Sequence, residues 1–158
     1  MPATTTAREI MTAEVSTFGP DVPLLDAARR LFDNRWAGAP VLEHGKIVGV
    51  LSLADVIAQE RSVHAPTPII VFDALLYLGT RRFEKEMKKI TAMTVRNAMT
   101  SPAKTVSPTT KVSEIAAMMI DDGLSTVPVV EDGELVGLVG RRDVVRLVLG
   151  RDRADSEQ

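Results

Sequence analysis

The chain contains no cysteine, and only two of its 158 residues are histidines, His44 and His64. The absence of cysteine excludes disulfide bonds and thiol chemistry, and two histidines leave too few soft ligands for a zinc site. Neither histidine stands in a motif with a serine or cysteine partner, and no glycine-rich loop ends in Gly-Lys-Ser or Gly-Lys-Thr. We therefore expect neither a catalytic site nor a metal cofactor.

Long hydrophobic runs and an excess of charge of one sign are also missing. The longest apolar run, residues 69–78, is too short to span a bilayer and contains Asp73. Residues 1–8 lack the charged start and apolar core of a signal peptide. A net charge of −2 gives no reason to invoke nucleic acid or an anionic membrane as a partner. We expect a soluble, cytoplasmic protein.

The sequence repeats itself at an offset of 88 residues, without a gap. The aligned pairs are residues 8–12 with 96–100, 17–20 with 105–108, 39–45 with 127–133, and 47–55 with 135–143. Proline, glycine and aspartate stay in register, which indicates a duplication. One copy alone would bury too little apolar surface to be stable, so we expect two copies that complete a common core.

Hydrophobic periodicity and turn signals predict the order strand, helix, strand, strand, helix for each copy. In the first copy the predicted elements are residues 15–18, 22–35, 39–43, 47–51 and 53–60. In the second copy they are residues 103–106, 112–122, 127–131, 135–139 and 142–149. His44-Gly45 and Asp132-Gly133 are typical two-residue hairpin turns, and Gly123 is placed to end a helix.

The longer helix of each copy is amphipathic, and its apolar side chains predict a buried face. The expected faces are Leu24, Ala28, Leu31, Phe32 and Trp36 in the first copy, and Val112, Ile115, Ala116, Met119 and Ile120 in the second. Phe32 and Trp36 are interpreted as core or dimer-contact residues.

A segment that belongs to neither copy separates them. Residues 69–78 could form a helix or a buried strand, and the helix is favoured. Residues 81–91 predict a second helix with a basic face, which is either a solvated surface or a contact for a partner or a ligand's phosphates. The expected divisions are residues 1–61, 62–95, 96–150 and a disordered tail, 151–158.

Polar residues mark the corner where the last strand of the first copy meets its last helix. Ser52 ends the strand, and Asp55 lies in the first turn of the helix. Free N–H groups at a helix start can bind an anion, and a carboxylate can accept hydrogen bonds from a ribose diol. Alternatively, Ser52 and Asp55 only cap the helix. In the second copy Asp143 matches Asp55, but Gly140 stands in place of Ser52.

The order of these motifs resembles that of the cystathionine-β-synthase (CBS) domain. The shared pattern is Met-Thr, a strand before a proline, an amphipathic helix, apolar-Pro-Val, and Gly-apolar-apolar-Ser-x-x-Asp. Two copies in tandem resemble a CBS pair, or Bateman module, over about two thirds of the chain. The resemblance implies an α+β fold in which two repeats, related by a pseudo-twofold axis, pack through their sheets.

The resemblance also implies regulation by a bound ligand and not catalysis, because CBS pairs commonly bind AMP, ADP or ATP in clefts between the repeats. The residues that it assigns to cleft one are Ser52, Asp55, Thr100, Lys104, Ser125, Thr126 and Val127. Those that it assigns to cleft two are Thr12, Ser16, Ala37, Gly38, Ala39, Arg142 and Asp143. In this pattern the aspartate holds the ribose, the serine or threonine contacts ribose or phosphate, and the residues before Pro-Val contact the adenine.

The two clefts are expected to differ in strength. Cleft one has a residue for each role, and Lys104 offers positive charge to a phosphate. Cleft two lacks a hydroxyl at Gly140; Arg141 and Arg142 could contact phosphate instead, or they could be ordinary surface charges. The alternative function is an interaction module with vestigial clefts, which acts through homodimerisation of its helices or through an unidentified protein partner.

Overall fold

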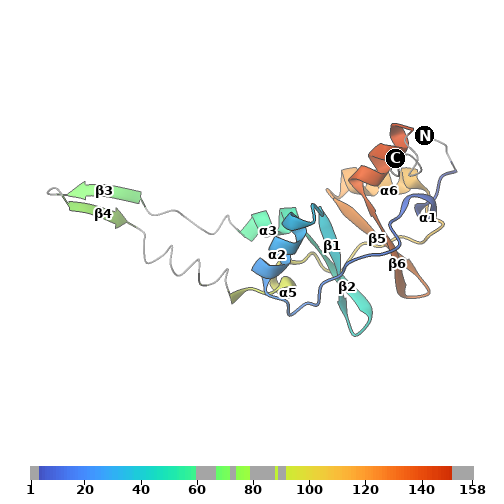
Figure 1. Cartoon of the computed structure of the whole chain (residues 1–158). Coiled ribbons are helices and arrows are strands. Elements are labelled where there is room, and N and C mark those ends of the chain that lie inside the picture. Colours follow the sequence, from blue (N-terminus) through green and yellow to red (C-terminus); the bar gives the residue numbers. More distant parts are fainter. Residues whose placement is uncertain (1–3, 60–66, 72–73, 79–87, 89–91, 151–158) are drawn as a thin grey trace.

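The computed structural model describes residues 4–59, 67–71, 74–78, 88 and 92–150. The elements in chain order are α1 (Ala7–Ile10), α2 (Leu24–Asp33), β1 (Gly38–Glu43), β2 (Lys46–Ser52), α3 (Leu53–Gln59), β3 (Thr67–Val71), β4 (Ala74–Leu78), α5 (Val95–Ala98), α6 (Val112–Asp121), β5 (Thr126–Glu131), β6 (Glu134–Gly140) and α7 (Arg141–Val148). Figure 1 shows two lobes side by side, with the β3–β4 hairpin lying apart from them. The first lobe contains α2, β1, β2 and α3, and the second contains α6, β5, β6 and α7.

Each lobe is built on an antiparallel hairpin, as the turn signals predicted. The turn residues His44 and Gly45 have φ of 52° and 75°, and Asp132 and Gly133 have φ of 52° and 77°. Positive φ at both positions is what a two-residue turn between twisted strands requires. β1 contacts β5 and β2 contacts β6, so the lobes pack through their sheets. The predicted α+β fold of two packed repeats is therefore confirmed.

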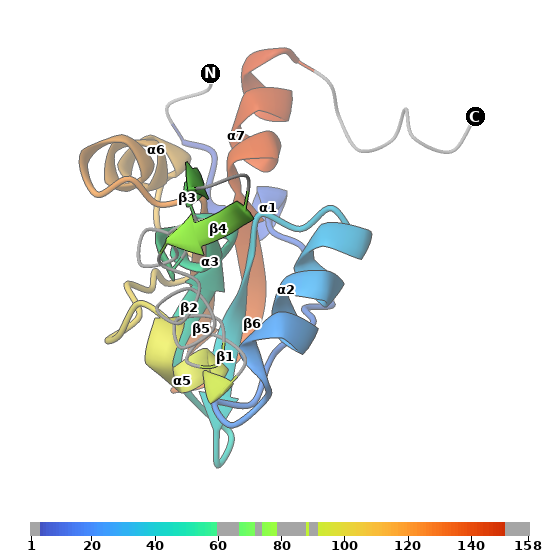
Figure 2. The ribbon, with the colours of Figure 1, turned by 90° about the vertical axis from the view of Figure 1, so that its left-hand side faces the viewer.

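The long helices lie on opposite sides of the strands, as Figure 2 shows for α2 and α6. Residues 24, 27 and 31 of α2 are buried, as are residues 112, 115 and 119 of α6. The wider predicted faces were wrong at Phe32, which is 75% exposed, and at Ile120, which is 80% exposed. Phe32 follows buried Leu31, and a step of one residue turns a side chain by about 100° around the helix.

The predicted strands at residues 15–18 and 103–106 were wrong. Each segment makes only a single-residue parallel bridge, Phe18 with Val41 and Val106 with Val129. Phe18 N–H donates to Pro40 O and Leu42 N–H donates to Phe18 O. Because Pro40 has no N–H of its own to donate, the pairing cannot continue as a regular ladder.

The favoured helix at residues 69–78 was also wrong, because the described parts of this segment are β3 and β4, which pair from Thr67–Leu78 to Val71–Ala74. The run Ile-Ile-Val at 69–71 is β-branched throughout, and such residues favour strands. The helix predicted at 81–91 lies outside the described residues except for residue 88, and the tail 151–158 lies wholly outside them.

Two four-residue helices, α1 and α5, were not predicted from the sequence. Each precedes one repeat and packs in the lobe formed by the other repeat. Ala7 and Ile10 of α1, followed by Met11, are buried in the core of the second lobe. Val95 and Ala98 of α5 are buried in the core of the first lobe. The core of each lobe therefore contains the helix that leads into the other repeat, so neither core is complete without the other repeat.

Backbone hydrogen bonds hold the exchanged segments, and they occur in pairs 88 residues apart. The donor N–H groups and acceptor carbonyls are Ala7 to Thr110 (2.8 Å), Val95 to Val22 (2.9 Å), Thr12 to Leu138 (2.9 Å) and Thr100 to Val50 (2.9 Å). Each N-terminal segment therefore satisfies its backbone on the opposite lobe, where an unpaired buried N–H would be costly.

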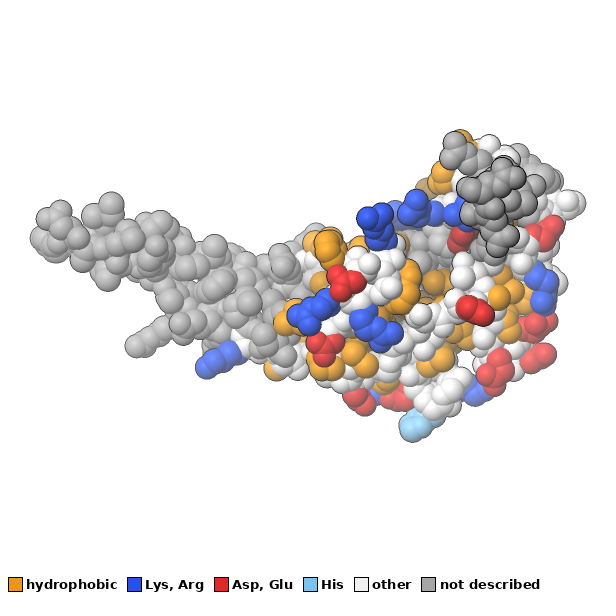
Figure 3. All heavy atoms as spheres, viewed as in Figure 1, with side chains coloured by type: hydrophobic (Ala, Val, Ile, Leu, Met, Phe, Trp, Pro, Cys, Tyr) orange, Lys and Arg blue, Asp and Glu red, His pale blue; other side chains and the backbone are white. Residues whose placement is uncertain are grey.

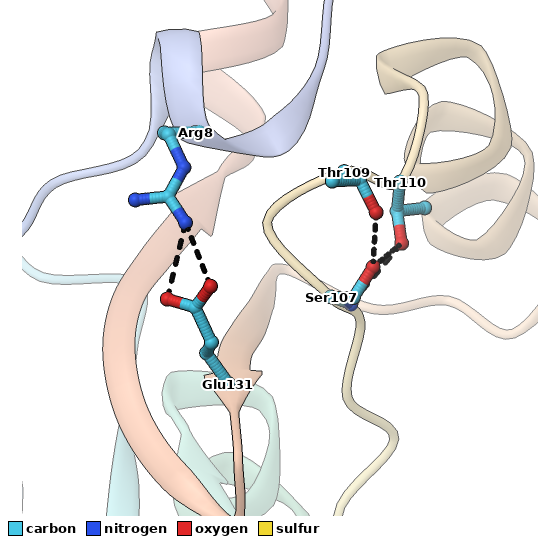
Figure 4. A network of polar contacts seen from close by, with 5 residues as sticks. All are labelled: Arg8, Ser107, Thr109, Thr110 and Glu131. Atoms are coloured by element: carbon cyan, nitrogen blue, oxygen red, sulfur yellow. Dashed lines mark hydrogen bonds and ion pairs between the residues drawn. The ribbon is translucent and has the colours of Figure 1, made fainter.

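Ion pairs at the surface also join each of these short helices to the opposite lobe. Arg8 of α1 reaches Glu131 at the end of β5, 3.0 Å away, and its equivalent Arg96 reaches Glu43. The hydrogen bond with Glu43 raises the pKa of Arg96 above its usual range, so this guanidinium keeps its charge. Figure 4 shows the Arg8 pair beside the turn at Ser107, whose hydroxyl lies 3.1 Å from the hydroxyl of Thr110. That turn presents the carbonyl to which Ala7 N–H donates.

The methionine of each Met-Thr motif packs on a glycine of the opposite sheet. A Cβ placed on Gly49 would lie 2.8 Å from Met99 Sδ and 2.8 Å from the backbone oxygen of Thr100. The three atoms nearest to a Cβ placed on Gly137 all belong to the side chain of Met11. The motif glycines therefore allow the close approach of the exchanged segments.

We predict that Gly49→Ala lowers the free energy of unfolding by about 1–3 kcal/mol, the cost of overpacking. Gly137→Ala should cost less, because a methionine side chain can move and a backbone carbonyl cannot. Urea unfolding followed by circular dichroism measures both changes. Gly19→Ala is the control, since a Cβ there would lie 3.8 Å from its nearest neighbour; equal stability of all three variants would contradict the packing role.

Candidate ligand clefts

Cleft one is a hollow of about 440 Å³ between the lobes, at the corner where β2 meets α3. Its walls are Val50, Ser52, Ala54, Asp55, Thr100, Pro102, Ala103, Lys104, Asp122, Gly123, Leu124, Ser125 and Thr126. All the residues that the sequence assigned to this cleft lie in its walls except Val127, which is fully buried in the core of the second lobe.

Asp55 is held by both repeats. Its Oδ2 accepts a hydrogen bond from Ser52 N–H at 2.8 Å, and Asp55 N–H donates to Ser52 Oγ at 3.1 Å. This reciprocal pair of hydrogen bonds caps α3, as the alternative interpretation of Ser52 and Asp55 expected. Thr100 Oγ1, which arrives with the exchanged segment, donates to Asp55 Oδ1 at 3.1 Å. The cap residue thus also lines an inter-lobe cleft.

Lys104 is already paired. Its Nζ lies 2.8 Å from Asp122 Oδ2, and both residues line cleft one. The pair is half exposed, so its net energy is small. A phosphate that approaches Lys104 would have to compete with the Asp122 carboxylate for it. The positive charge that the sequence offered to a phosphate is therefore partly neutralised.

Cleft two is a smaller hollow of about 260 Å³ at the equivalent corner, where β6 meets α7. Its walls are Thr12, Glu14, Val15, Ser16, Arg35, Trp36, Ala37, Gly38, Thr126, Leu138, Gly140, Arg141, Arg142 and Asp143. The residues assigned to it from the sequence lie in its walls except Ala39, which is buried in the core of the first lobe.

The carboxylate in cleft two is held differently from Asp55. Asp143 Oδ2 accepts a hydrogen bond from Gly140 N–H at 2.8 Å, which repeats half of the Ser52–Asp55 cap. Glycine has no hydroxyl to return the bond to Asp143 N–H. Arg146 Nη1 lies 3.4 Å from Asp143 Oδ1. This carboxylate therefore has a cation beside it, whereas Asp55 forms no ion pair within the part of the chain that the structure describes.

Thr126 lies in the walls of both clefts. It is 7% exposed, and its Oγ1 has no hydrogen-bond partner among the described residues. A Cβ placed on Gly38, its equivalent in the first repeat, would lie 3.0 Å from this oxygen. A buried hydroxyl without a partner is unfavourable, and a bound ligand could supply the missing hydrogen bond.

The sequence model of the CBS domain matches residues 7–61 and 95–150. The chain belongs to the CBS-domain family. The two CBS repeats are the two lobes, each with the leading helix that the other lobe buries, which confirms the resemblance seen in the sequence.

The relatives include uncharacterised and plant CBS proteins. The chain is 28% identical to protein MJ1426 of Methanocaldococcus jannaschii, over 82% of this chain and 83% of that protein. It is 28% identical to the chloroplastic CBSX1 of Arabidopsis thaliana, over 91% of this chain but only 64% of CBSX1.

Solved CBS-pair structures share the fold. CBSX2, determined in complex with AMP, superposes with a TM-score of 0.68 at 24% identity, over 92% of this chain and 96% of CBSX2. Protein MJ0100, a CBS pair in complex with 5′-methylthioadenosine and S-adenosyl-L-methionine, superposes with a TM-score of 0.67 at 24% identity, over 94% of this chain and 98% of that one. Among the described residues of our chain, no helix has the length and apolar content that a membrane crossing needs.

Sequence reasoning missed wall residues that lie on loops. Arg35 and Trp36 follow α2 in cleft two, and their equivalents Gly123 and Leu124 follow α6 in cleft one. The CBS motif assigned only the residues immediately before Pro-Val. The 88-residue offset could have identified the loop residues, because a residue that lines a cleft in one repeat predicts that its equivalent lines the other cleft.

We predict that Thr126→Val raises the free energy of unfolding of the ligand-free protein by about 1 kcal/mol, because valine has the same shape and leaves no hydroxyl unpaired. Thr100→Val is the matched variant: it removes a hydroxyl that is paired with Asp55 and should lower stability. Thermal unfolding by calorimetry measures both. Loss of stability in Thr126→Val would mean that its hydroxyl already has a partner.

Proposed function

We propose that the protein is a regulatory module that binds an adenosine nucleotide of the AMP, ADP or ATP class between its two CBS repeats. One observation carries this proposal: the Asp55 carboxylate lines cleft one while it accepts a hydrogen bond from Thr100 of the other repeat. The cleft volume, about 440 Å³, falls in the range of small-molecule sites.

Asp55 keeps acceptor capacity for a diol. An ionised carboxylate offers about four lone-pair directions. The hydrogen bonds from Ser52 N–H and Thr100 Oγ1 take one direction on each oxygen. A ribose presents two neighbouring hydroxyl donors, which suit the remaining lone pairs. The buried hydroxyl of Thr126 is a further group that a ligand could satisfy.

Two relatives of known structure support the adenosine class. CBSX2 binds AMP, and MJ0100 binds 5′-methylthioadenosine and S-adenosyl-L-methionine. What these ligands share is the adenosine group. Both relatives are under 25% identical to this chain, so they support only the adenosine class of the ligand. The number of phosphates that the ligand carries has to be inferred from the residues of the clefts.

Binding in such a cleft would act as a signal. Residues 52 and 55 come from the first repeat, and residues 100 and 104 arrive from the segment that leads into the second. A ligand that contacts both favours the arrangement in which they lie together, by an amount set by its concentration and affinity. The module would regulate a partner through this shift and would not itself catalyse a reaction.

We predict that Asp55→Asn weakens binding of AMP by about 1–3 kcal/mol, the contribution of hydrogen bonds to a charged acceptor. Asparagine retains an oxygen that can cap α3, so the fold should survive. Isothermal titration calorimetry gives the affinity, and circular dichroism checks the fold. Asp33→Asn, at an exposed position of α2, is the control that matches the change in charge. Equal losses in both variants would remove Asp55 from the site.

We also propose that the protein forms a homodimer through its helices. The apolar residues Ile120 and Val145 line a groove of about 410 Å³ between α6 and α7. The first repeat presents Phe32 on α2, 75% exposed, and Ile57 on neighbouring α3. Phe32 is a bulky projection that suits the groove of a second copy. A twofold axis would make this contact twice and close the assembly.

The dimer proposal predicts that Phe32→Glu gives a monomer in size-exclusion chromatography with light scattering, because a carboxylate cannot be buried unpaired in an apolar groove. Glu134→Lys is the control, since β6 starts at the hairpin end that lies away from the helices in Figure 1. A monomeric wild type, or a dimeric Phe32→Glu, would contradict the proposed contact.

A further inference from the structure

The two clefts differ in the charge of their walls. Cleft one contains two carboxylates and one ammonium group, which give a formal charge of −1, and the ammonium group of Lys104 is paired with Asp122. Cleft two contains the three guanidinium groups of Arg35, Arg141 and Arg142 with two carboxylates, which give +1. A duplicated site has thus acquired opposite signs in its two copies.

The arginines of cleft two are available for an anion. Arg35 and Arg142 form no ion pair with the described residues, and both line the cleft. Arg141 donates its Nε–H to Leu124 O at 2.9 Å. This bond orients the guanidinium group, and its terminal N–H groups can still donate to an anion. Figure 3 shows a row of basic side chains between the lobes at the start of α7. Guanidinium groups match phosphate geometry with two parallel hydrogen bonds.

The backbone at Arg35 is a second, independent observation. Arg35 has φ of 56°, in the left-handed region that non-glycine residues rarely adopt. Its equivalent in the other repeat is Gly123, with φ of 65°. Both residues lie just beyond the end of a helix, where glycine is the unstrained choice. Strain of this kind gathers at functional sites, and here the strained residue is a wall arginine.

We infer that cleft two selects a nucleoside polyphosphate, whose phosphate chain lies among Arg35, Arg141 and Arg142. Cleft one, by contrast, gains nothing from additional phosphates, so among AMP, ADP and ATP it favours AMP. The inference rests on the proposed function and adds the charge of the ligand to it. It also reverses the ranking expected from sequence for phosphate-rich ligands, because the hydroxyl missing at Gly140 matters less than three guanidinium groups.

The experiment separates the clefts with two variants of the full chain. Asp55→Asn impairs cleft one, and Asp143→Asn impairs cleft two while an amide oxygen remains to accept from Gly140 N–H. Adenosine, AMP, ADP and ATP are titrated into each by calorimetry at low and high salt. In Asp55→Asn we expect affinity to rise about tenfold or more from AMP to ATP, with a gain that shrinks in high salt. In Asp143→Asn the gain should be absent.

Arg35→Gly gives the sharper test. Glycine relieves the left-handed backbone, so the ligand-free melting temperature should rise, while the preference for ATP over AMP in the Asp55→Asn background should fall about tenfold. A purely structural arginine would not change the ATP-to-AMP ratio. Arg29→Gln, exposed on α2 and outside the cleft, is the control for the loss of one positive charge.

The outcomes distinguish the inference from the function on which it rests. If adenosine and its nucleotides bind but phosphate number makes no difference in Asp55→Asn, or the ATP preference stays in Asp143→Asn, the charge assignment is wrong and the adenosine site stands. An unchanged ATP-to-AMP ratio in Arg35→Gly removes Arg35 from the phosphate site. If no adenosyl compound binds the wild type, the proposed function and this inference both fail.

Discussion

The exchange of α1 and α5 between the repeats is the constraint on which the rest of the molecule depends. Ala7 and Val95 are fully buried in the lobe opposite to their own repeat, and their N–H groups are satisfied there. A repeat separated from its partner would lose part of its core and leave these backbone groups unpaired. The exchange also determines where the clefts form, because the Thr of each Met-Thr motif arrives beside the strand-to-helix corner of the other repeat. The same exchanged segments thus complete the cores of the lobes and form walls of the clefts.

The sequence predicted what local chemistry decides. The two hairpins follow from turn residues that accept positive φ, and the buried faces of α2 and α6 follow from helical spacing, at least for Leu31 and Ile115. The errors occurred where tertiary contacts decide. Phe32 fits a helical face but points away from the core, and four-residue helices are too short to show periodicity. All the residues assigned from the sequence except Val127 and Ala39 line the clefts, because the repeat and the CBS motif together name both walls. Arg35, by contrast, lies on a loop that the motif does not cover.

The two copies differ where they meet at the centre of the molecule. Gly38 and Thr126 occupy equivalent positions and face each other near the centre of the molecule, where a Cβ on Gly38 would lie 3.0 Å from Thr126 Oγ1. A side chain at position 38 would crowd this oxygen, so a small residue is favoured in one of the two copies. The difference continues outward: Ser52 is matched by Gly140, and Gly123 by Arg35. Steric exclusion at the centre thus accompanies a chemical division of the clefts, one with a complete cap and a carboxylate excess, the other with guanidinium groups.

Thr126 also links the clefts physically, since one hydroxyl lies in the walls of both. A hydroxyl has a single hydrogen to donate and two lone pairs that can accept. A ligand in one cleft that receives this hydrogen leaves only an acceptor for a ligand in the other. If each ligand accepted this hydrogen when bound alone, two ligands bound together could not both accept it. Their affinities would then be coupled without any backbone movement, and linkage would require the coupling to be equal in both directions. A duplicated fold with a single threonine at its centre therefore has the means to make one occupied cleft affect the other.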